Sequence, residues 1–231
     1  MPKVTLHILQ TVDARIDGDF FSIPETLALA RESAGIRERL GWDCIVYGAT
    51  TVREIFPGGT QAKVDADPVP SGDHVIGAAE RWIAVVDPDG TCAFSSPVST
   101  RRGMEGARFV ALVNAATPEG YLAYLRDAGV SYLICGGESF SASIALEKLE
   151  RLCGVRQVLL MGGGVADATF AAERCIDEMS LVIVPSAEVG RNVPTLFEPL
   201  PGMDIRPLEL ALLSCEAIGE GGVWLRYAVR D

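Results

Sequence analysis

Short apolar segments typical of buried strands alternate along this chain with longer segments typical of helices. Three of the apolar segments run directly into glycine, at Tyr47-Gly48, Cys135-Gly136-Gly137 and Met161-Gly162-Gly163-Gly164. This alternation predicts an α/β fold in which helices cover a mostly parallel sheet. Ligands of such folds bind beyond the carboxyl ends of the strands, so we expect a site at the glycine-ended segments.

Periodicity and capping residues place the individual elements. Strands are predicted at 3–10, 43–47, 82–86, 108–113, 131–135, 155–161 and 179–184. Helices are predicted at 24–40, from 50, after a capping Thr117, at 141–152 and after 164. The last two strand patterns, 208–215 and 223–229, are joined by a glycine-rich turn and predict an antiparallel hairpin at the sheet edge. A long excursion rich in Gly and Pro spans about 57–80.

Length and charge narrow the class of protein. A chain of 231 residues can bury one substantial core, so a single domain over residues 1–231 is predicted. The formal net charge of −11 argues against binding nucleic acid through a broad basic face. No apolar run reaches the roughly 18 residues that a membrane span needs, and the N-terminus lacks the apolar core of a signal peptide. We therefore expect a cytoplasmic protein with neither a nucleic-acid nor a membrane partner.

The cysteines and histidines do not indicate a metal centre. Six cysteines lie far apart without a CxxC pair, and four sit in apolar contexts such as Leu213-Ser214-Cys215, which predicts buried free thiols. The two histidines, His7 and His74, neighbour no other candidate ligand. A zinc site or a histidine-based triad is therefore not expected.

The segment Leu160-Met161-Gly162-Gly163-Gly164-Val165-Ala166 is the best candidate for binding a phosphate. Successive glycines let backbone N–H groups approach a phosphate without an intervening Cβ, and a following helix adds its positive N-terminal end. A plain turn would explain the glycines equally well. The GxGxxG spacing, a P-loop lysine and a GxSxG elbow are all missing, which disfavours a standard Rossmann dehydrogenase and an α/β-hydrolase.

An acidic loop follows the first strand. It carries Asp13, Asp17 and Asp19 and then Phe20 and Phe21. One interpretation is a solvated acidic loop. The other is a loop that covers a reacting ring, in which the two phenylalanines exclude water from a hydride transfer.

The order of these motifs resembles the reductase domain of bacterial riboflavin synthesis, within the dihydrofolate-reductase-like superfamily. Thr11-Val12-Asp13-Ala14-Arg15-Ile16 is similar to that family's S-L-D-G-[KR]-I, and Tyr47-Gly48-Ala49-Thr50-Thr51-Val52 is similar to its second motif. Trp82-Ile83-Ala84-Val85-Val86-Asp87 is similar to its central strand and turn. The family's later motifs follow in order between Val158 and Phe197, namely the glycines, Asp177-Glu178, Val184-Pro185, Gly190 and Leu196-Phe197.

The resemblance implies a dihydrofolate-reductase-like three-layer sandwich, NADPH as hydride donor and a homodimer. By position it implies a cofactor site lined by Gln10, Thr51, Asp87, Gly162, Gly163, Gly164, Val165 and Ala166. It also implies a site for a small heterocyclic substrate at Thr11, Asp13, Glu54 and Met161. No residue stands out as the general acid; Asp13 and Glu54 are the candidates, and a bound water could serve instead.

The substrate half of the chain departs from the family pattern. Ala14 replaces a family glycine, Ile55 stands where riboflavin members often carry an acid, and Met161 stands where they carry a glutamate that contacts substrate. The favoured function is reduction of the ribosylamino side chain of a pyrimidine intermediate to the ribityl form. One alternative is a reductase of the same fold acting on a pterin, a xenobiotic or another small heterocycle. Another is a nucleotide-binding module without catalysis, which steady NADPH oxidation with any substrate would exclude.

Overall fold

The computed structural model describes residues 1–58 and 70–230, so part of the predicted excursion at 57–80 lies outside the described residues. The chain divides into two compact units. Unit 1 comprises Met1–Pro2 and Asp43–Arg156, and unit 2 comprises Lys3–Trp42 and Gln157–Asp231. Each unit is described by itself, and a single domain over residues 1–231 stays a prediction.

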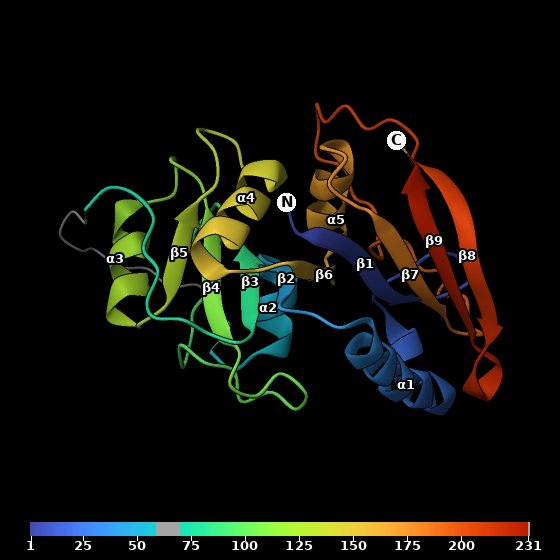
Figure 1. Cartoon of the computed structure of the whole chain (residues 1–231). Coiled ribbons are helices and arrows are strands. Elements are labelled where there is room, and N and C mark those ends of the chain that lie inside the picture. Colours follow the sequence, from blue (N-terminus) through green and yellow to red (C-terminus); the bar gives the residue numbers. More distant parts are fainter. Residues whose placement is uncertain (59–69, 231) are drawn as a thin grey trace. The chain divides into compact units, whose positions relative to one another are not determined.

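Unit 1 contains four parallel strands in the order β5-β4-β3-β2 (Figure 1). Their bounds are β2 Cys44–Gly48, β3 Trp82–Val86, β4 Arg108–Val113 and β5 Ser131–Ile134. The helices of this unit are α2 Ala49–Ile55, α3 Glu119–Asp127 and α4 Ala142–Cys153. These strands are buried on both faces, which is why they read in the sequence as continuous apolar runs.

The predicted cap of α3 is wrong. Pro118, not Thr117, is the N-cap residue, and no side chain caps this helix. The Thr117 hydroxyl instead donates a hydrogen bond to the Pro88 carbonyl at 2.6 Å. A nearby backbone acceptor therefore competes successfully for the hydroxyl that the sequence pattern assigns to the helix.

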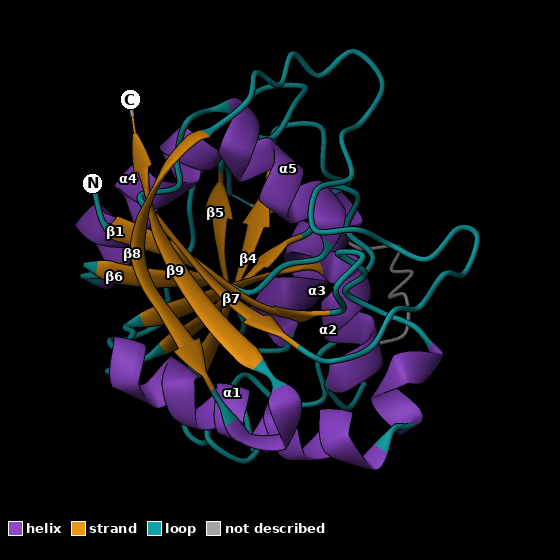
Figure 2. Cartoon of the chain, turned by 90° about the vertical axis from the view of Figure 1, so that its right-hand side faces the viewer, coloured by secondary structure: helices purple, strands orange, loops and turns teal. Residues whose placement is uncertain are grey.

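Unit 2 contains five strands in the order β6-β1-β7-β9-β8. Their bounds are β1 Lys3–Gln10, β6 Gln157–Leu160, β7 Glu178–Ile183, β8 Glu209–Ala217 and β9 Val223–Arg230. β6 and β7 run parallel to β1, whereas β9 and β8 are antiparallel and form the predicted C-terminal hairpin. The helices α1 (Pro24–Leu40) and α5 (Gly164–Ala172) lie on opposite sides of these strands, as Figure 2 shows. Two short 3-10 helices, η1 (Asp19–Ser22) and η2 (Gly219–Gly221), complete this unit.

A buried histidine ties α1 to the strands of unit 2. The side chain of His7 on β1 is fully buried; its Nδ1 lies 3.0 Å from Ser180 Oγ, and its Nε2 lies 3.2 Å from the Ser33 carbonyl on α1. Trp224 Nε1 donates to the same Ser180 hydroxyl at 2.9 Å. Burial lowers the pKa of His7 to about 4, so its ring is neutral at neutral pH. Apolar packing of Ile36 on α1 against Trp224 completes the contact.

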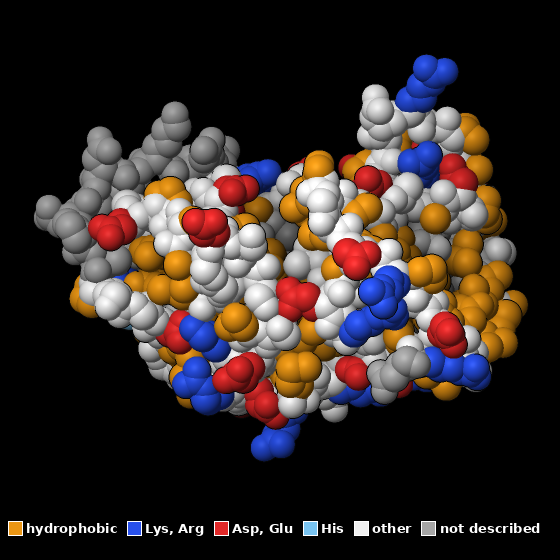
Figure 3. Space-filling model, turned by 90° about the horizontal axis from the view of Figure 1, so that it is seen from above, with side chains coloured by type: hydrophobic (Ala, Val, Ile, Leu, Met, Phe, Trp, Pro, Cys, Tyr) orange, Lys and Arg blue, Asp and Glu red, His pale blue; other side chains and the backbone are white. Residues whose placement is uncertain are grey.

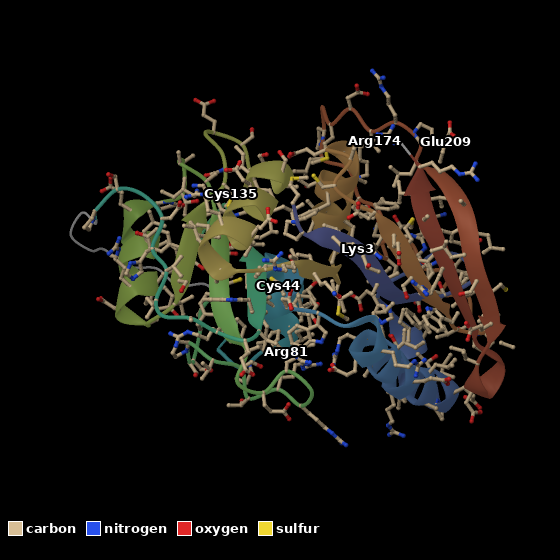
Figure 4. The ribbon with its side chains drawn as sticks, in the orientation of Figure 1. Lys3, Cys44, Arg81, Cys135, Arg174 and Glu209 are labelled. Carbon is tan, nitrogen blue, oxygen red and sulfur yellow. The ribbon has the colours of Figure 1, made fainter. Side chains whose placement is uncertain are left out.

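Four of the six free thiols are buried, as predicted, and Cys153 is half-buried. Cys44 and Cys135, labelled in Figure 4, are fully buried among the strands of unit 1, and burial raises the pKa of the Cys135 thiol to about 12. Cys92 and Cys175 are also buried. The expectation for Cys215 is wrong, because this residue is exposed on the edge strand β8. Its apolar sequence context marks an uncovered face of the hairpin rather than a core.

That uncovered face is apolar. The pairing of β8 with β9 places Leu210, Leu212 and Cys215 opposite Val229, Tyr227 and Leu225, on the side of the hairpin away from Trp224. Leu212 is 59% exposed and Leu213 is 49% exposed. Figure 3 shows hydrophobic side chains gathered over this part of unit 2. Among the described residues, no helix is long and apolar enough to cross a membrane.

Candidate functional site

The glycine loop joins β6 to α5 at the carboxyl end of β6. Gly162 has φ +61° and Gly163 has φ +92°, both in the region that favours glycine, and Gly163 is the N-cap of α5. The first turn of the helix leaves backbone N–H groups without intrahelical partners, and the helix dipole adds partial positive charge there. The loop therefore has the features of an anion site that the sequence predicts.

A second loop packs against the start of α5. The backbone N–H of Glu198 donates to the Gly164 carbonyl at 2.9 Å. A Cβ added to Gly164 would lie 2.5 Å from the Thr195 carbonyl oxygen, so this position admits only glycine. The Glu198 carboxylate in turn accepts hydrogen bonds from the Thr195 N–H and hydroxyl, both at 2.7 Å, which lower the pKa of Glu198.

Gln10 and Thr11 lie at the carboxyl end of β1, where Gln10 pairs with Ile183 of β7. Both are buried, and Gln10 Oε1 has no hydrogen-bond partner among the described residues. The Thr11 hydroxyl donates to Asp13 and accepts from the Arg15 N–H at 2.9 Å. An unpaired buried amide oxygen is unfavourable by about 1–3 kcal/mol, which is why such a group at a strand end points to a ligand.

Asp13 serves as an acceptor that joins two loops. Its carboxylate accepts hydrogen bonds from the Thr11 hydroxyl and from the backbone N–H groups of Glu188 and Val189, the latter two at 3.1 Å. The Thr11 hydrogen bond is the main cause of a lowered pKa. A carboxylate that is ionised and engaged in this way is poorly suited to donate a proton.

Ala14, which stands where the family pattern has glycine, lies in a backbone conformation that favours glycine. Its φ is +61°, in the left-handed region that residues with a Cβ seldom occupy. The N–H of Ala14 donates to the Thr11 carbonyl at 3.0 Å, and this bond closes the turn. The turn after β1 therefore holds a residue with a Cβ in a conformation that favours glycine.

The two phenylalanines of the acidic loop differ in burial. Phe20 is buried against Leu29 and Val184 in the core of unit 2. Phe21 is 37% exposed and contacts Phe20 with their ring centroids 4.3 Å apart. Phe20 is thus a core residue, and Phe21 is the one that remains available as an apolar surface.

The remaining predicted site residues belong to unit 1. Thr51 and Glu54 lie on α2, Thr51 half-buried and Glu54 exposed. Asp87, at the end of β3, is buried and accepts hydrogen bonds from Tyr121 Oη at 2.7 Å and from the backbone N–H groups of Thr91 and Cys92 at 2.9 Å. These bonds give Asp87 a structural role in its turn, and its contact with a cofactor stays a prediction.

The structure thus places most of the predicted residues within unit 2. Gln10, Thr11 and Asp13 follow β1, and residues 161–166 follow the neighbouring strand β6. Sequence reasoning missed Asp167, the next residue of α5, whose carboxyl is fully buried with neither oxygen bonded among the described residues. The available signal was an acid inside an otherwise apolar helix. The described residues contain no cluster of metal-ligating side chains.

Comparison with known families agrees with this arrangement. The model of the RibD C-terminal domain matches residues 2–224. The chain belongs to the RibD C-terminal domain family. Comparison with curated protein sequences gives no match. The resemblance drawn from the motifs is therefore confirmed at the level of the family.

Solved structures share the fold of this RibD C-terminal-like chain. A pyrimidine reductase-like protein from Corynebacterium diphtheriae has a TM-score of 0.69 at 18% identity, covering 100% of this chain and 93% of that one. RibD of Acinetobacter baumannii has a TM-score of 0.62 at 18% identity, covering 100% of this chain and 58% of that one. The Saccharomyces riboflavin biosynthesis reductase Rib7 has a TM-score of 0.58 at 17% identity, covering 99% and 90%. At these identities the likeness establishes the dihydrofolate-reductase-like fold.

Proposed function

We propose that this RibD C-terminal-like chain is an NADPH-dependent reductase that converts the ribosylamino side chain of a riboflavin-pathway pyrimidine to the ribityl form. Family membership and the names of the structural neighbours support a pyrimidine reductase. The observation that carries the proposal is the glycine loop at the start of α5, and the buried, unpaired Gln10 Oε1 at the end of β1 agrees with it. These features fit a ligand that has both a phosphate and polar groups.

The residues of unit 2 would bind and orient the cofactor. Backbone N–H groups of Gly164, Val165 and Ala166 would hold a phosphate, and Gln10 would meet a polar group of the nucleotide. Bound NADPH would supply a hydride from its nicotinamide ring. The contribution of the chain would then be orientation and exclusion of water. Thr51 and Asp87 in unit 1 remain cofactor contacts that the resemblance implies.

Calorimetric titration with NADPH and NADH tests the cofactor assignment. Tighter binding of NADPH supports it, and equal or reversed affinities would overturn it. Gly163→Ala should weaken NADPH binding by at least ~10-fold, about 1.4 kcal/mol, because an added methyl is strained at φ +92° and narrows the approach to the backbone. Gly154→Ala is the matched control, since Gly154 also has positive φ (+72°) but ends α4 in open space.

Two residues that differ from the family pattern support a second class of substrate as an alternative. Met161 is half-buried at the end of β6, and Ile55 ends α2, so both positions offer apolar surface where riboflavin members carry acids. A pterin, which lacks the polar ribosyl chain, or another small heterocycle with fewer polar groups would suit apolar surface at either position. Competition of a pterin and of the ribosylaminopyrimidine for the NADPH-bound chain distinguishes the two, because the true substrate class should bind more tightly.

We further propose that the chain forms a homodimer through the uncovered hairpin face. This face combines the exposed Leu210, Leu212, Leu213 and Cys215 with the half-buried Val223, Leu225, Tyr227 and Val229. Exposed apolar patches of this kind mark interaction sites. A two-fold symmetric interface places a surface patch against the same patch of the second copy. Because the chain has a net charge of −11, two copies repel each other least where they meet through an uncharged face.

Sedimentation equilibrium tests the dimer. Leu212→Glu should convert a dimer into a monomer, because it places two carboxylates in the apolar interface. Leu27→Glu is the control, since Leu27 is 46% exposed on α1, the helix that packs against the opposite, Trp224 side of the hairpin. A monomeric wild-type chain at micromolar concentration would contradict the proposal.

A further inference from the structure

Asp167 is a buried acid whose carboxyl makes no hydrogen bond among the described residues. Its side chain has no exposed surface, and both carboxyl oxygens lack a hydrogen-bond partner among the described residues. Burial raises the pKa of Asp167 well above its usual range, so the neutral acid is favoured. A carboxyl buried without partners destabilises the fold, and an apolar residue of similar size would be more favourable there.

The position of Asp167 places it at the glycine loop. It lies in the first turn of α5, on the same buried stripe as Phe170 and Ala171, three and four residues further on. A Cβ added to Gly162 would lie 2.5 Å from Asp167 Oδ2. On this side the carboxyl therefore faces a glycine rather than a side chain.

Gln10 is a second buried polar side chain in unit 2, carried by the sheet. His7 on β1 contacts Ser33 on α1, so residues of β1 with odd numbers face α1. Gln10 lies on the other face of the strand, toward α5, and its Oε1 is also buried without a partner. The pairing of β1 with β6 ends at Leu6, and Gln10 pairs with Ile183 of β7 further along the strand. The helix and the sheet thus each carry one unpaired polar group on this side of β1.

From the unpaired, buried carboxyl of Asp167 and its place at the glycine loop we infer that Asp167 is a ligand-binding residue that pairs with the amide edge of a bound heterocycle. A neutral carboxyl presents a donor and an acceptor side by side, which matches the N–H and C=O of a carboxamide or a lactam. The inference rests on the proposed function for the ligand's identity. Two sources have this chemistry, namely the carboxamide of nicotinamide and the lactam of a pyrimidinedione.

Three variants at and near this position test the inference. Asp167→Leu removes both hydrogen-bonding groups, Asp167→Asn keeps a donor beside an acceptor, and Thr169→Val is a control on the same helix. Each is measured for its thermal midpoint, for NADPH affinity by calorimetry and for the KM of the pyrimidine. The shift of the thermal midpoint on adding millimolar nicotinamide or uracil is also measured, because this measurement does not depend on the proposed function.

We expect Asp167→Leu to raise the thermal midpoint and to weaken one ligand by at least ~10-fold. Loss in the NADPH and nicotinamide arms identifies the carboxamide, whereas loss in the KM and uracil arms identifies the lactam. Asp167→Asn should stay within about 3-fold of wild type, which corresponds to less than 1 kcal/mol. The proposed function fails if the wild-type chain neither binds NADPH nor reduces the pyrimidine. The inference still stands in that case if nicotinamide or uracil raises the thermal midpoint of the wild-type chain but not that of Asp167→Leu. A lower midpoint for Asp167→Leu, or unchanged binding of all four ligands, would overturn the inference.

Discussion

The carboxylate of Asp13 accepts a hydrogen bond from the backbone amide of Val189 at 3.1 Å, across 176 residues of sequence. Val189 is a β-branched residue that is 82% exposed and has φ +48°, a conformation that such residues rarely adopt. The neighbouring amide of Glu188 donates to the same carboxylate. Asp13 therefore holds the loop after β7 against the loop after β1.

Asp13→Ala should loosen the loop after β7, because it removes the acceptor for both amides. Amide hydrogen exchange at Glu188 and Val189 should speed up, while Asp19→Ala, which changes an exposed acid in η1, should leave it unchanged. The pKa of Asp13 is lowered on folding, so this stabilisation is present above the unfolded pKa of about 3.9 and is lost as pH falls through the folded value. Equal exchange in the two variants would show that the contact does not hold the loop.

Ala14→Gly should stabilise the chain by about 0.5–1 kcal/mol, because glycine adopts positive φ without the strain that a Cβ imposes. Urea unfolding measures the change. Ala30→Gly, in the middle of α1, is the opposing control and should destabilise the chain by a similar amount. If both variants are destabilised, Ala14 is not strained in solution.

The fold was largely predictable from the sequence, and the reasons are local. Buried strands such as β3 and β4 have uninterrupted apolar runs, and α1 is framed by Pro24 and by Gly41 with φ +72°. The hairpin was predictable for the same reason. The exposure of Cys215 was not predictable, because it depends on whether another part of the chain covers the hairpin. The hydrogen bond of Thr117 was not predictable either, because its acceptor, the Pro88 carbonyl, lies elsewhere in the sequence.

The candidate site was predictable only in part. The glycine loop follows from a strand end, which sequence periodicity locates, whereas Gln10 follows from the family resemblance. Asp167 did not follow, because a single acid in a helix is usually solvated and its burial depends on packing against the sheet. The acceptor roles of Asp13 and Asp87 depend on partners that lie elsewhere in the chain or on a neighbouring helix.

His7 should make the chain sensitive to mild acid. Its pKa falls from 6.5 to about 4 on folding, so its stabilising effect is complete above pH 6.5 and is lost as pH falls toward 4. The loss amounts to about 3 kcal/mol by linkage. Urea unfolding between pH 7 and 4.5 should show a smaller loss for His7→Gln, which cannot titrate. The same loss in both proteins would mean that other groups carry the acid sensitivity.

Tyr121→Phe should destabilise the chain by about 1–3 kcal/mol, because it removes one donor from the buried carboxylate of Asp87. Asp87→Asn should destabilise it as well, since the amide replaces an acceptor that takes hydrogen bonds from Thr91, Cys92 and Tyr121. Thermal unfolding measures both effects. Wild-type stability in both variants, combined with weaker NADPH binding, would instead favour a direct cofactor contact for Asp87.

Turnover of the ribosylated pyrimidine tests the central claim most directly. The purified chain is mixed with NADPH and 5-amino-6-ribosylamino-pyrimidinedione, and loss of NADPH absorbance is followed while the pyrimidine product is identified by mass. We predict steady oxidation of NADPH with one ribityl product formed for each NADPH consumed, and a loss of this activity in Gly163→Ala that Gly154→Ala does not share. Intact NADPH binding without formation of the ribityl product would contradict the riboflavin assignment and leave a reductase fold with a different substrate.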